Sequence, residues 1–281
     1  MNQAEESAPT PRHRLLAFVC IAAAVVLGII GFALGGAPSS FMLVNGAGLT
    51  VLASVLIPGD HGRTRFIPPL VTLLGLALLV ATLFVGPEVE GVQRWIRLGP
   101  LTLHAGMLVL PAMIAVFVRQ RQAVAFPATV VCAAVFSLQP DLGSALALIG
   151  GLALAMAGRR LVLAEVAMCL VALVAVLATA SRPDPLGAVA FVETALSDGW
   201  RTSPPLGAAM AAAVAMAIVL PPWLLVRGNP DLRDSGRGVI GALGGYAVAS
   251  LLGPFPQPLI GYGASPIVGL GLALAVLRFT R

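Results

Sequence analysis

Long runs of apolar residues, separated by short polar segments, extend along this chain from one end to the other. Most runs approach the roughly 20 residues that a helix needs to cross the hydrocarbon core of a bilayer. Only helices and closed barrels satisfy their backbone hydrogen bonds there, so each run predicts a membrane-spanning helix. The ten predicted spans are residues 15–34, 41–57, 67–85, 101–118, 123–138, 142–157, 161–180, 206–226, 239–252 and 259–277. The pattern predicts an all-α polytopic membrane protein with about ten transmembrane helices, the span 239–252 being the shortest.

The composition agrees with this class of protein. Hydrophobic residues make up 58% of the 281 residues and charged residues 10%, and the mean hydropathy is +0.97. A soluble domain exposes more polar surface than such a chain can supply. The three cysteines, Cys20, Cys132 and Cys169, lie within predicted spans, where we expect small buried hydrophobic side chains and not disulfide partners. No cluster of cysteine and histidine in the sequence suggests a metal site.

The charges then predict the topology. Lysine is absent, so all 17 basic residues are arginine, and cytoplasmic loops of membrane proteins collect such residues. With a cytoplasmic N-terminus, ten spans leave only Arg94, Arg97, Arg182 and Arg201 outside. We therefore expect a cytoplasmic tail at residues 1–14, one transmembrane domain at residues 15–281, a first span that is retained as an anchor, and both termini in the cytoplasm. The net charge of +5 is then a topology signal and does not indicate nucleic acid as a partner.

The predicted outer loops, residues 86–100, 139–143, 181–205 and 253–266, hold most of the candidate chemistry. In the first loop, Arg94 and Arg97 flank Trp95. One interpretation is an interfacial belt, in which tryptophan and arginine lie at the lipid headgroups. The other is an anion site, because guanidinium groups bind pyrophosphate through paired hydrogen bonds.

The second loop carries a lone carboxylate in the string Gln139-Pro140-Asp141-Leu142-Gly143. Pro140 should stop one helix, and Asp141 should cap the next by accepting from backbone amides near Gly143 and Ser144. Such a cap contributes about 1 kcal/mol. A carboxylate beside hydrocarbon is also a candidate functional group, and the two roles do not exclude each other.

The two remaining outer loops differ in character. In residues 181–205, Asp184-Pro185 is a good helix start and apolar residues follow at helical spacing, so we expect a short helix on the membrane surface. Its polar residues, among them Glu193, Asp198 and Arg201, are expected to face solvent. The prolines and glycines of residues 253–266 predict irregular backbone, which at membrane depth is tolerated only beside a protein cavity or water.

Four ordered strings in these loops resemble one family. They are RWIRLGP at residues 94–100, QPDLG at 139–143, DPLG at 184–187 and PQPLIGYGAS at 256–265. Together with ten spans, they make the chain similar over nearly its full length to the SEDS (shape, elongation, division and sporulation) proteins FtsW, RodA and SpoVE. The resemblance implies a multi-pass protein of the bacterial inner membrane that polymerises the peptidoglycan precursor lipid II at the outer face. It also implies a class B penicillin-binding protein, a transpeptidase, as partner.

The resemblance assigns expected roles to individual residues. It implies that Arg94, Arg97, Gln139 and Asp141 contact the lipid-linked pyrophosphate. It implies that Trp95, Gly143, Tyr262 and Ser265 are motif residues that shape the cavity. In an active enzyme a carboxylate would act as general base on the acceptor hydroxyl. No cofactor is expected, and a divalent cation would be needed only by an active polymerase.

The chain departs from the family where catalysis is expected. The family's His-Thr-Asp-Phe string before the eighth span has no counterpart, since Arg201 is followed by Thr202, Ser203 and two prolines. The family's Pro-Ser-Glu-x-x-Lys pattern falls on Ala105, Gly106, Met107 and Leu110, so both of its charged residues are missing.

These departures leave three hypotheses. The favoured one is a divergent, shortened SEDS protein that binds lipid II or its partner with lost or reduced glycosyltransferase activity. The second is an active polymerase in which Asp198 or Asp184 replaces the missing base. A lipid or small-molecule transporter, which the broken outer segments alone would suggest, ranks last. No carboxylate or lysine lies deep in a predicted span, because Glu165 is about one turn from Arg160 and can reach toward it.

Overall fold

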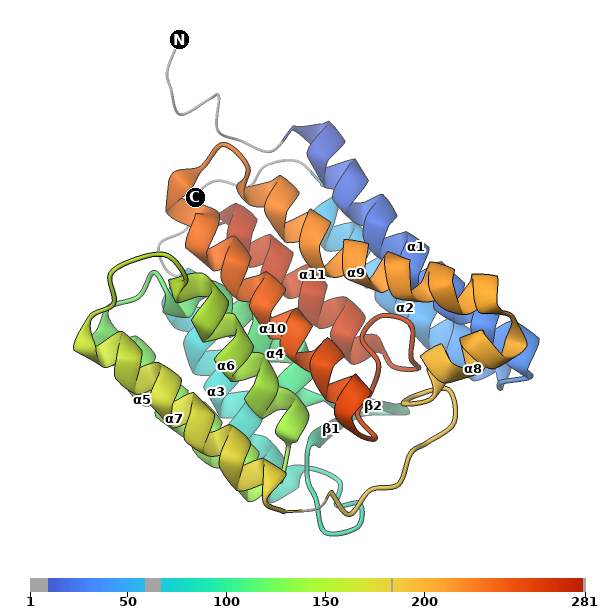
Figure 1. Cartoon of the computed structure of the whole chain (residues 1–281), viewed down its shortest axis with the longest axis horizontal. Coiled ribbons are helices and arrows are strands. Elements are labelled where there is room, and N and C mark those ends of the chain that lie inside the picture. Colours follow the sequence, from blue (N-terminus) through green and yellow to red (C-terminus); the bar gives the residue numbers. More distant parts are fainter. Residues whose placement is uncertain (1–9, 59–66, 183, 280–281) are drawn as a thin grey trace.

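The computed structural model describes residues 10–58, 67–182 and 184–279, which form a bundle of long helices (Figure 1). In that part of the chain, one long helix coincides with each predicted span, so the expected number of about ten is confirmed. Five helices, α1, α2, α3, α7 and α9, are long and apolar enough to cross a membrane, and α4, α5, α6 and α11 are shorter apolar helices. The ten are α1 (Pro11–Gly35), α2 (Ser39–Leu56), α3 (Ile67–Val85), α4 (Ala105–Phe117), α5 (Gln122–Leu138), α6 (Leu142–Met156), α7 (Leu163–Ala180), α9 (Pro204–Val226), α10 (Arg233–Leu252) and α11 (Ala264–Phe279).

A β-hairpin precedes α4, so the predicted helical span of residues 101–118 is wrong in its first four residues. Strand β1 (Trp95–Leu98) pairs with β2 (Leu101–His104) in antiparallel register, Leu98 opposite Leu101. The two-residue turn between them is Gly99-Pro100, and Gly99 has a φ of 58°. A glycine with positive φ at the first turn position matches the twist of the strands. The prediction failed because the apolar residues of β2 continue into those of α4.

The short helix expected from Asp184 lies further along the chain. It is α8 (Ala195–Thr202), and residues 184–194 are turns and irregular backbone. One Asp184 oxygen accepts from the amide of Leu186 at 3.1 Å and the other binds Arg94. Asp184 therefore begins a local turn and not a helix, and Arg94 holds that turn in place.

The irregular backbone expected within residues 253–266 is confirmed over residues 253–263. The predicted span of residues 259–277 is wrong at its start, because α11 begins at Ala264. The Asn45 side chain of α2 holds the preceding loop by donating to the Gly261 carbonyl at 3.0 Å and accepting from the Gly263 amide at 3.0 Å. Two hydrogen bonds between residues far apart in sequence thus hold the chain where a turn of helix was predicted, and single-sequence patterns do not reveal such contacts.

Glycines allow α10 to lie in the centre of the bundle against α6 (Figure 1), the most extensive helix contact in the described structure. A Cβ added at Gly150 of α6 would clash with the Gly241 carbonyl oxygen, and one at Gly245 would clash with the Leu146 carbonyl oxygen. Small residues let helix backbones approach closely in membranes. Residues 239–252 gave only a short apolar run because this part of α10 is rich in glycine, which the close contact with α6 requires.

The start of α1 and the end of α11 lie at the same end of the bundle (Figure 1), which we call the termini end. Arg14 and Arg278 are buried there and both donate to the Pro58 carbonyl, at 2.8 and 2.7 Å, just beyond the end of α2. Glu165 binds Arg159 at 2.5 Å and not the expected Arg160. Helix α1 starts within the predicted tail, whose residues 1–9 lie outside the described residues, as do Arg63, Arg65 and Arg281.

Candidate functional site

Four segments that are distant in sequence meet at the opposite end of the bundle, which we call the loop end (Figure 1). They are the β1–β2 hairpin, the α5–α6 turn, the segment of residues 184–194 and the loop of residues 253–263. Each contains one of the strings that the sequence singled out. The fold therefore brings the four strings to one place.

Arg94 joins three of these segments. Its Nε donates to the Gln139 carbonyl at 2.9 Å, one terminal nitrogen donates to the Pro140 carbonyl at 2.9 Å, and the other binds Asp184 at 2.7 Å. The side chains of Arg94 and Asp184 are only 4% and 8% exposed. Because every guanidinium nitrogen has a partner and the charge is balanced by Asp184, the geometry gives Arg94 a structural role. Its predicted contact with pyrophosphate stays a prediction.

Gln139 is buried and holds the hairpin to the end of α3. Its Nε2 donates to the Thr82 hydroxyl at 2.6 Å and to the Gln93 carbonyl at 2.5 Å. The Gln139 side chain therefore faces protein, and its backbone carbonyl accepts the hydrogen bond from Arg94. Gln139 thus supports Arg94 and the hairpin and is not among the residues that line the cavity described below.

Asp141 caps α6 as expected. One carboxylate oxygen accepts from the Ser144 amide at 2.9 Å, and the side chain is 2% exposed. The other oxygen faces the Nε2 of His104 at 3.5 Å. Asp141 therefore combines the predicted cap with a second contact to the hairpin.

His104 is buried between the hairpin and α4. Its Nδ1 accepts from the Met107 amide at 3.2 Å, its backbone amide donates to the Ser265 hydroxyl at 2.8 Å, and its ring meets that of Trp95 edge to face. Burial lowers the pKa of His104, against the opposing effect of the Asp141 charge. A proton on Nδ1 would also point at the Met107 N–H. His104 is thus held neutral, with its Nε2–H directed at Asp141.

These side chains surround a small cavity of about 20 Å³, enough for roughly one water molecule. Its polar lining residues are Arg94, His104, Asp141, Glu193 and Tyr246, and Pro254, Phe255 and Pro256 close one side. We call it the loop-end cavity. A sugar does not fit in it unless the segment around Phe255 moves.

Glu193 is the second carboxylate that lines this cavity, beside Asp141. It is half-buried, and one of its oxygens accepts from the Val189 amide at 2.7 Å. Burial raises the pKa of Glu193, and the charge of Asp184 adds to this rise. A cavity carboxylate with a raised pKa is suited to exchanging protons.

The other predicted residues are divided between the cavity and its surroundings. Trp95 and Gly143 line it, and Ser265 supports it through His104. Arg97 is exposed on β1. Tyr262 stacks on Phe41 with ring centroids 3.8 Å apart, outside the residues that line the cavity.

The two aspartates expected as replacement bases lie elsewhere. Asp184 is bound to Arg94. Asp198 of α8 accepts from the Thr194 hydroxyl at 2.5 Å and pairs with the exposed Arg201 at 3.2 Å. Neither is among the residues that line the cavity. Their roles in catalysis stay predictions.

Sequence reasoning missed His104, Glu193 and Tyr246. His104 sits one residue before the departure at Ala105, so the signal was a polar side chain at the end of an apolar run. Tyr246 reaches the cavity from α10, where its hydroxyl lies 3.1 Å from that of Ser144. Glu193 was passed over as a solvated residue, because its burial depends on the distant Phe255 loop.

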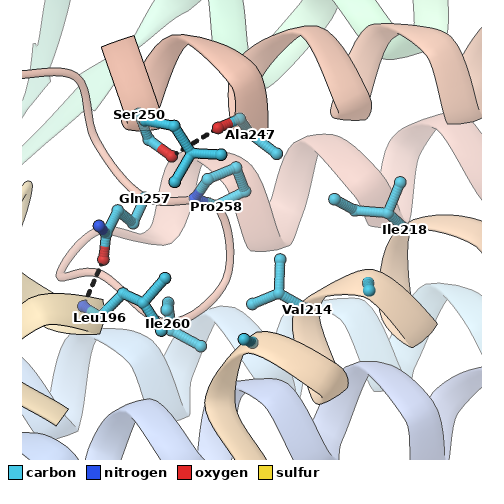
Figure 2. Close-up of a pocket in the computed structure, with 11 residues that line it drawn as sticks. Leu196, Val214, Ile218, Ala247, Ser250, Gln257, Pro258 and Ile260 are labelled. Carbon is cyan, nitrogen blue, oxygen red and sulfur yellow. Dashed lines mark hydrogen bonds between the residues drawn. The ribbon is translucent and has the colours of Figure 1, made fainter. Parts of the chain in front are cut away.

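A second cavity, of about 310 Å³, lies between α9, α10 and the loop of residues 253–263 (Figure 2). Its lining is almost entirely apolar and includes Val214, Ile218 and Ile260. Its polar groups are already bonded: Gln257 accepts from the Leu196 amide at 2.5 Å and Ser250 donates to the Ala247 carbonyl at 2.8 Å. This cavity suits hydrocarbon and offers no group for acid or base chemistry.

The described residues bring no three histidine, cysteine, aspartate or glutamate side chains together as a cation site. The divalent cation expected of an active polymerase stays a prediction.

The fold and site define a polytopic helical membrane protein with a polar, loop-enclosed cavity at one end. Solved structures share this architecture. RodA from Thermus thermophilus superposes with a TM-score of 0.64 over 93% of this chain and 95% of its own, at 24% identity. A chain from a structure described as coordinating polymerization and crosslinking by a peptidoglycan synthase complex gives 0.64 over 94% and 97%, at 22% identity. At these identities the likeness concerns the fold.

Curated relatives match parts of the sequence, whereas no protein-family model matches the chain. Three such relatives are each named probable peptidoglycan glycosyltransferase FtsW. The protein from Shewanella sediminis is 32% identical over 129 residues, that from Pseudoalteromonas atlantica 44% over 64, and that from Idiomarina loihiensis 35% over 77. The matches cover 41%, 23% and 26% of this chain but only 32%, 12% and 18% of those proteins. The shared fold and the local sequence matches together confirm the resemblance to the SEDS proteins. The matched segments span less than a third of the length of each curated relative.

Proposed function

We propose that the protein acts in peptidoglycan assembly at the bacterial inner membrane, where it binds lipid II or a related polyprenyl-linked precursor at its loop end without polymerising it efficiently. The relatives named FtsW are probable peptidoglycan glycosyltransferases, which supports the substrate class. The observation that carries the proposal is the loop-end cavity, in which the motif residues Trp95, Asp141 and Gly143 are assembled.

The bonding of the aspartates supports reduced catalysis. A general base must reach the proton that it removes. Asp184 is buried against Arg94, and Asp198 is paired on α8 outside the cavity. Neither is poised for the task of the missing family aspartate. Binding does not need a general base, but it does need the segment around Phe255 to move so that the precursor can reach the cavity residues and the exposed Arg97.

Polymerisation of purified lipid II by the purified full chain tests this proposal, with and without a candidate transpeptidase. We expect no glycan chains but measurable binding of lipid II. Glycan chains that are lost in Asp184→Ala or Asp198→Ala, in a variant that keeps the wild-type unfolding temperature, would overturn the proposal in favour of a relocated base at that aspartate. Ser197→Ala, an exposed neighbour on α8, is the matched control.

One observation favours a second candidate, an active polymerase with Glu193 as its base. Glu193 lines the cavity beside Asp141, and its pKa is raised by burial. A fixed general base contributes roughly 10² to 10⁴ in rate. If wild-type protein makes glycan, Glu193→Gln should reduce the rate by about that factor while lipid II binding is kept. An unchanged rate would exclude Glu193 as the base.

We further propose a class B penicillin-binding transpeptidase as the partner and a cytoplasmic position for both termini. A membrane-anchored partner needs an apolar surface in the bilayer, and the cavity between α9 and α10 (Figure 2) supplies one. Co-purification with the transpeptidase tests this. Val214→Trp should fill the cavity and weaken the complex, whereas Val166→Trp on the exposed side of α7 should not.

A further inference from the structure

A third cavity, of about 420 Å³, lies at the termini end where α9 passes through η1 (Pro230–Leu232) into α10. It is separate from the loop-end cavity and is lined by Trp223, Arg227, Asn229 and Arg233, among others. Two arginines and a tryptophan around one cavity distinguish it from the apolar cavity of Figure 2. It therefore has the composition of an anion site.

Its arginines differ in bonding from others at this end. Arg14 and Arg278 donate to backbone carbonyls, and Arg159 pairs with Glu165 and Asp234. Arg227 and Arg233 are exposed. Within residues 10–58, 67–182 and 184–279, neither forms an ion pair with an acidic side chain. Their charges are available to a ligand.

Neighbouring groups favour an anion further. The guanidinium of Arg227 lies over the Trp223 ring, 5.1 Å from its centroid, which orients the arginine. The Asn229 side-chain oxygen already accepts from the Asp231 amide at 3.1 Å, so its amide group remains as a donor. Arg233 is the first residue of α10, and a helix N-terminus adds partial positive charge.

An apolar stripe leads to this cavity along α9. Met216, Val219 and Trp223 are all about half exposed and recur at helical spacing, so they share one face. Tryptophan favours the membrane interface, with its ring at headgroup level. A ligand that combines hydrocarbon with a phosphate would contact both the stripe and the arginines.

We propose that this cavity binds the phosphodiester headgroup of an anionic phospholipid, such as phosphatidylglycerol or cardiolipin, from the leaflet at the termini end. The acyl chains lie along Met216 and Val219, and the phosphate contacts Arg227 and Arg233. Basic cavities between transmembrane helices bind such headgroups. This site is independent of the proposed role in peptidoglycan assembly.

Binding of phosphatidylglycerol to the purified full chain, followed by native mass spectrometry, tests the proposal. We expect retained phosphatidylglycerol and little retained phosphatidylcholine. The double variant Arg227→Gln/Arg233→Gln should bind phosphatidylglycerol at least about tenfold more weakly. Arg160→Gln, which removes an exposed charge at the same end, should bind like the wild type. Equal binding by the double variant and the wild type would overturn the proposal.

Two further arms complete the test. Soluble glycerol phosphate at matched concentration should not displace the lipid, and displacement would show that the arginines bind soluble phosphates instead. A photoreactive phosphatidylglycerol should cross-link wild-type protein within residues 216–233. This measurement does not depend on the folding of a variant, and cross-links concentrated elsewhere would contradict the assignment.

Discussion

Arg94 connects the hairpin, the α5–α6 turn and the segment around Asp184. Arg94→Ala would leave Asp184 buried without its partner. Breaking a buried ion pair in this way costs about 3–5 kcal/mol, so we expect a large decrease in thermal unfolding temperature. Arg97→Ala removes an exposed arginine from β1 and should change the unfolding temperature little. Equal losses in the two variants, measured by circular dichroism in detergent, would contradict the structural role of Arg94.

Glu193 should make stability depend on pH. Because burial raises its pKa, the folded protein binds more protons than the unfolded chain between the ordinary and the raised pKa. Stability therefore falls as pH rises through that interval. The loss of folding stability from burying the charged Glu193 carboxylate is absent below the ordinary pKa and complete above the raised pKa.

Glu193→Gln removes this titration and should flatten the dependence of unfolding temperature on pH in the interval that begins at the ordinary pKa of glutamate and ends at its raised pKa. Glu88→Gln, in an exposed part of the first loop, is the matched control and should keep the wild-type profile. A profile in Glu193→Gln that is as steep as in the wild type would show that Glu193 is not the titrating group.

At the scale of helices, the contact between α6 and α10 depends on individual glycines. A Cβ at Gly245 would clash with the Leu146 carbonyl oxygen, whereas one at Gly244 meets nothing within 4 Å. Gly245→Ala should therefore destabilise the bundle or prevent its assembly. Gly244→Ala should be neutral or stabilise by up to about 1 kcal/mol, because alanine loses less backbone entropy in a helix. Unfolding temperatures that decrease equally in both variants would contradict the close approach of these helices.

The helices could be predicted because their apolar runs are long and bounded by local signals, such as the Asp141 cap. The misplaced elements depend on distant contacts. Asp184 begins a turn and not a helix because Arg94, 90 residues away in sequence, binds it. The hairpin did have a local signal, Gly99-Pro100, but the apolar strand that follows merges with α4.

The site was predicted in part. The four strings marked the segments that meet at the loop end, since loops between adjacent spans emerge together. The hydrogen bonds and ion pairs within the site could not be predicted, because the partners of Arg94, Asp141 and His104 lie on different segments. Whether a side chain lines the cavity, as Glu193 does, or lies outside it, as Asp198 does, depends on how those segments pack.

For the whole molecule, the arginine distribution predicts a cytoplasmic termini end. A reporter fused after residue 281 that is active only in the cytoplasm should be active. The same reporter inserted after Gly187, in an exposed part of the loop end, should be inactive. A reporter that is active only in the periplasm should give the opposite pattern at both positions. Matching activities at the two positions would contradict the odd number of spans expected between them, namely α9, α10 and α11, and the expected orientation.

The most direct test of the account is equilibrium binding of fluorescent lipid II to the full chain in nanodiscs. We predict saturable binding that weakens about tenfold in Arg97→Ala, because a guanidinium beside the cavity contacts the pyrophosphate. Arg201→Ala, at an arginine that is 77% exposed on α8, should bind like the wild type. The absence of saturable binding, or equal affinities of Arg97→Ala and the wild type, would contradict the account.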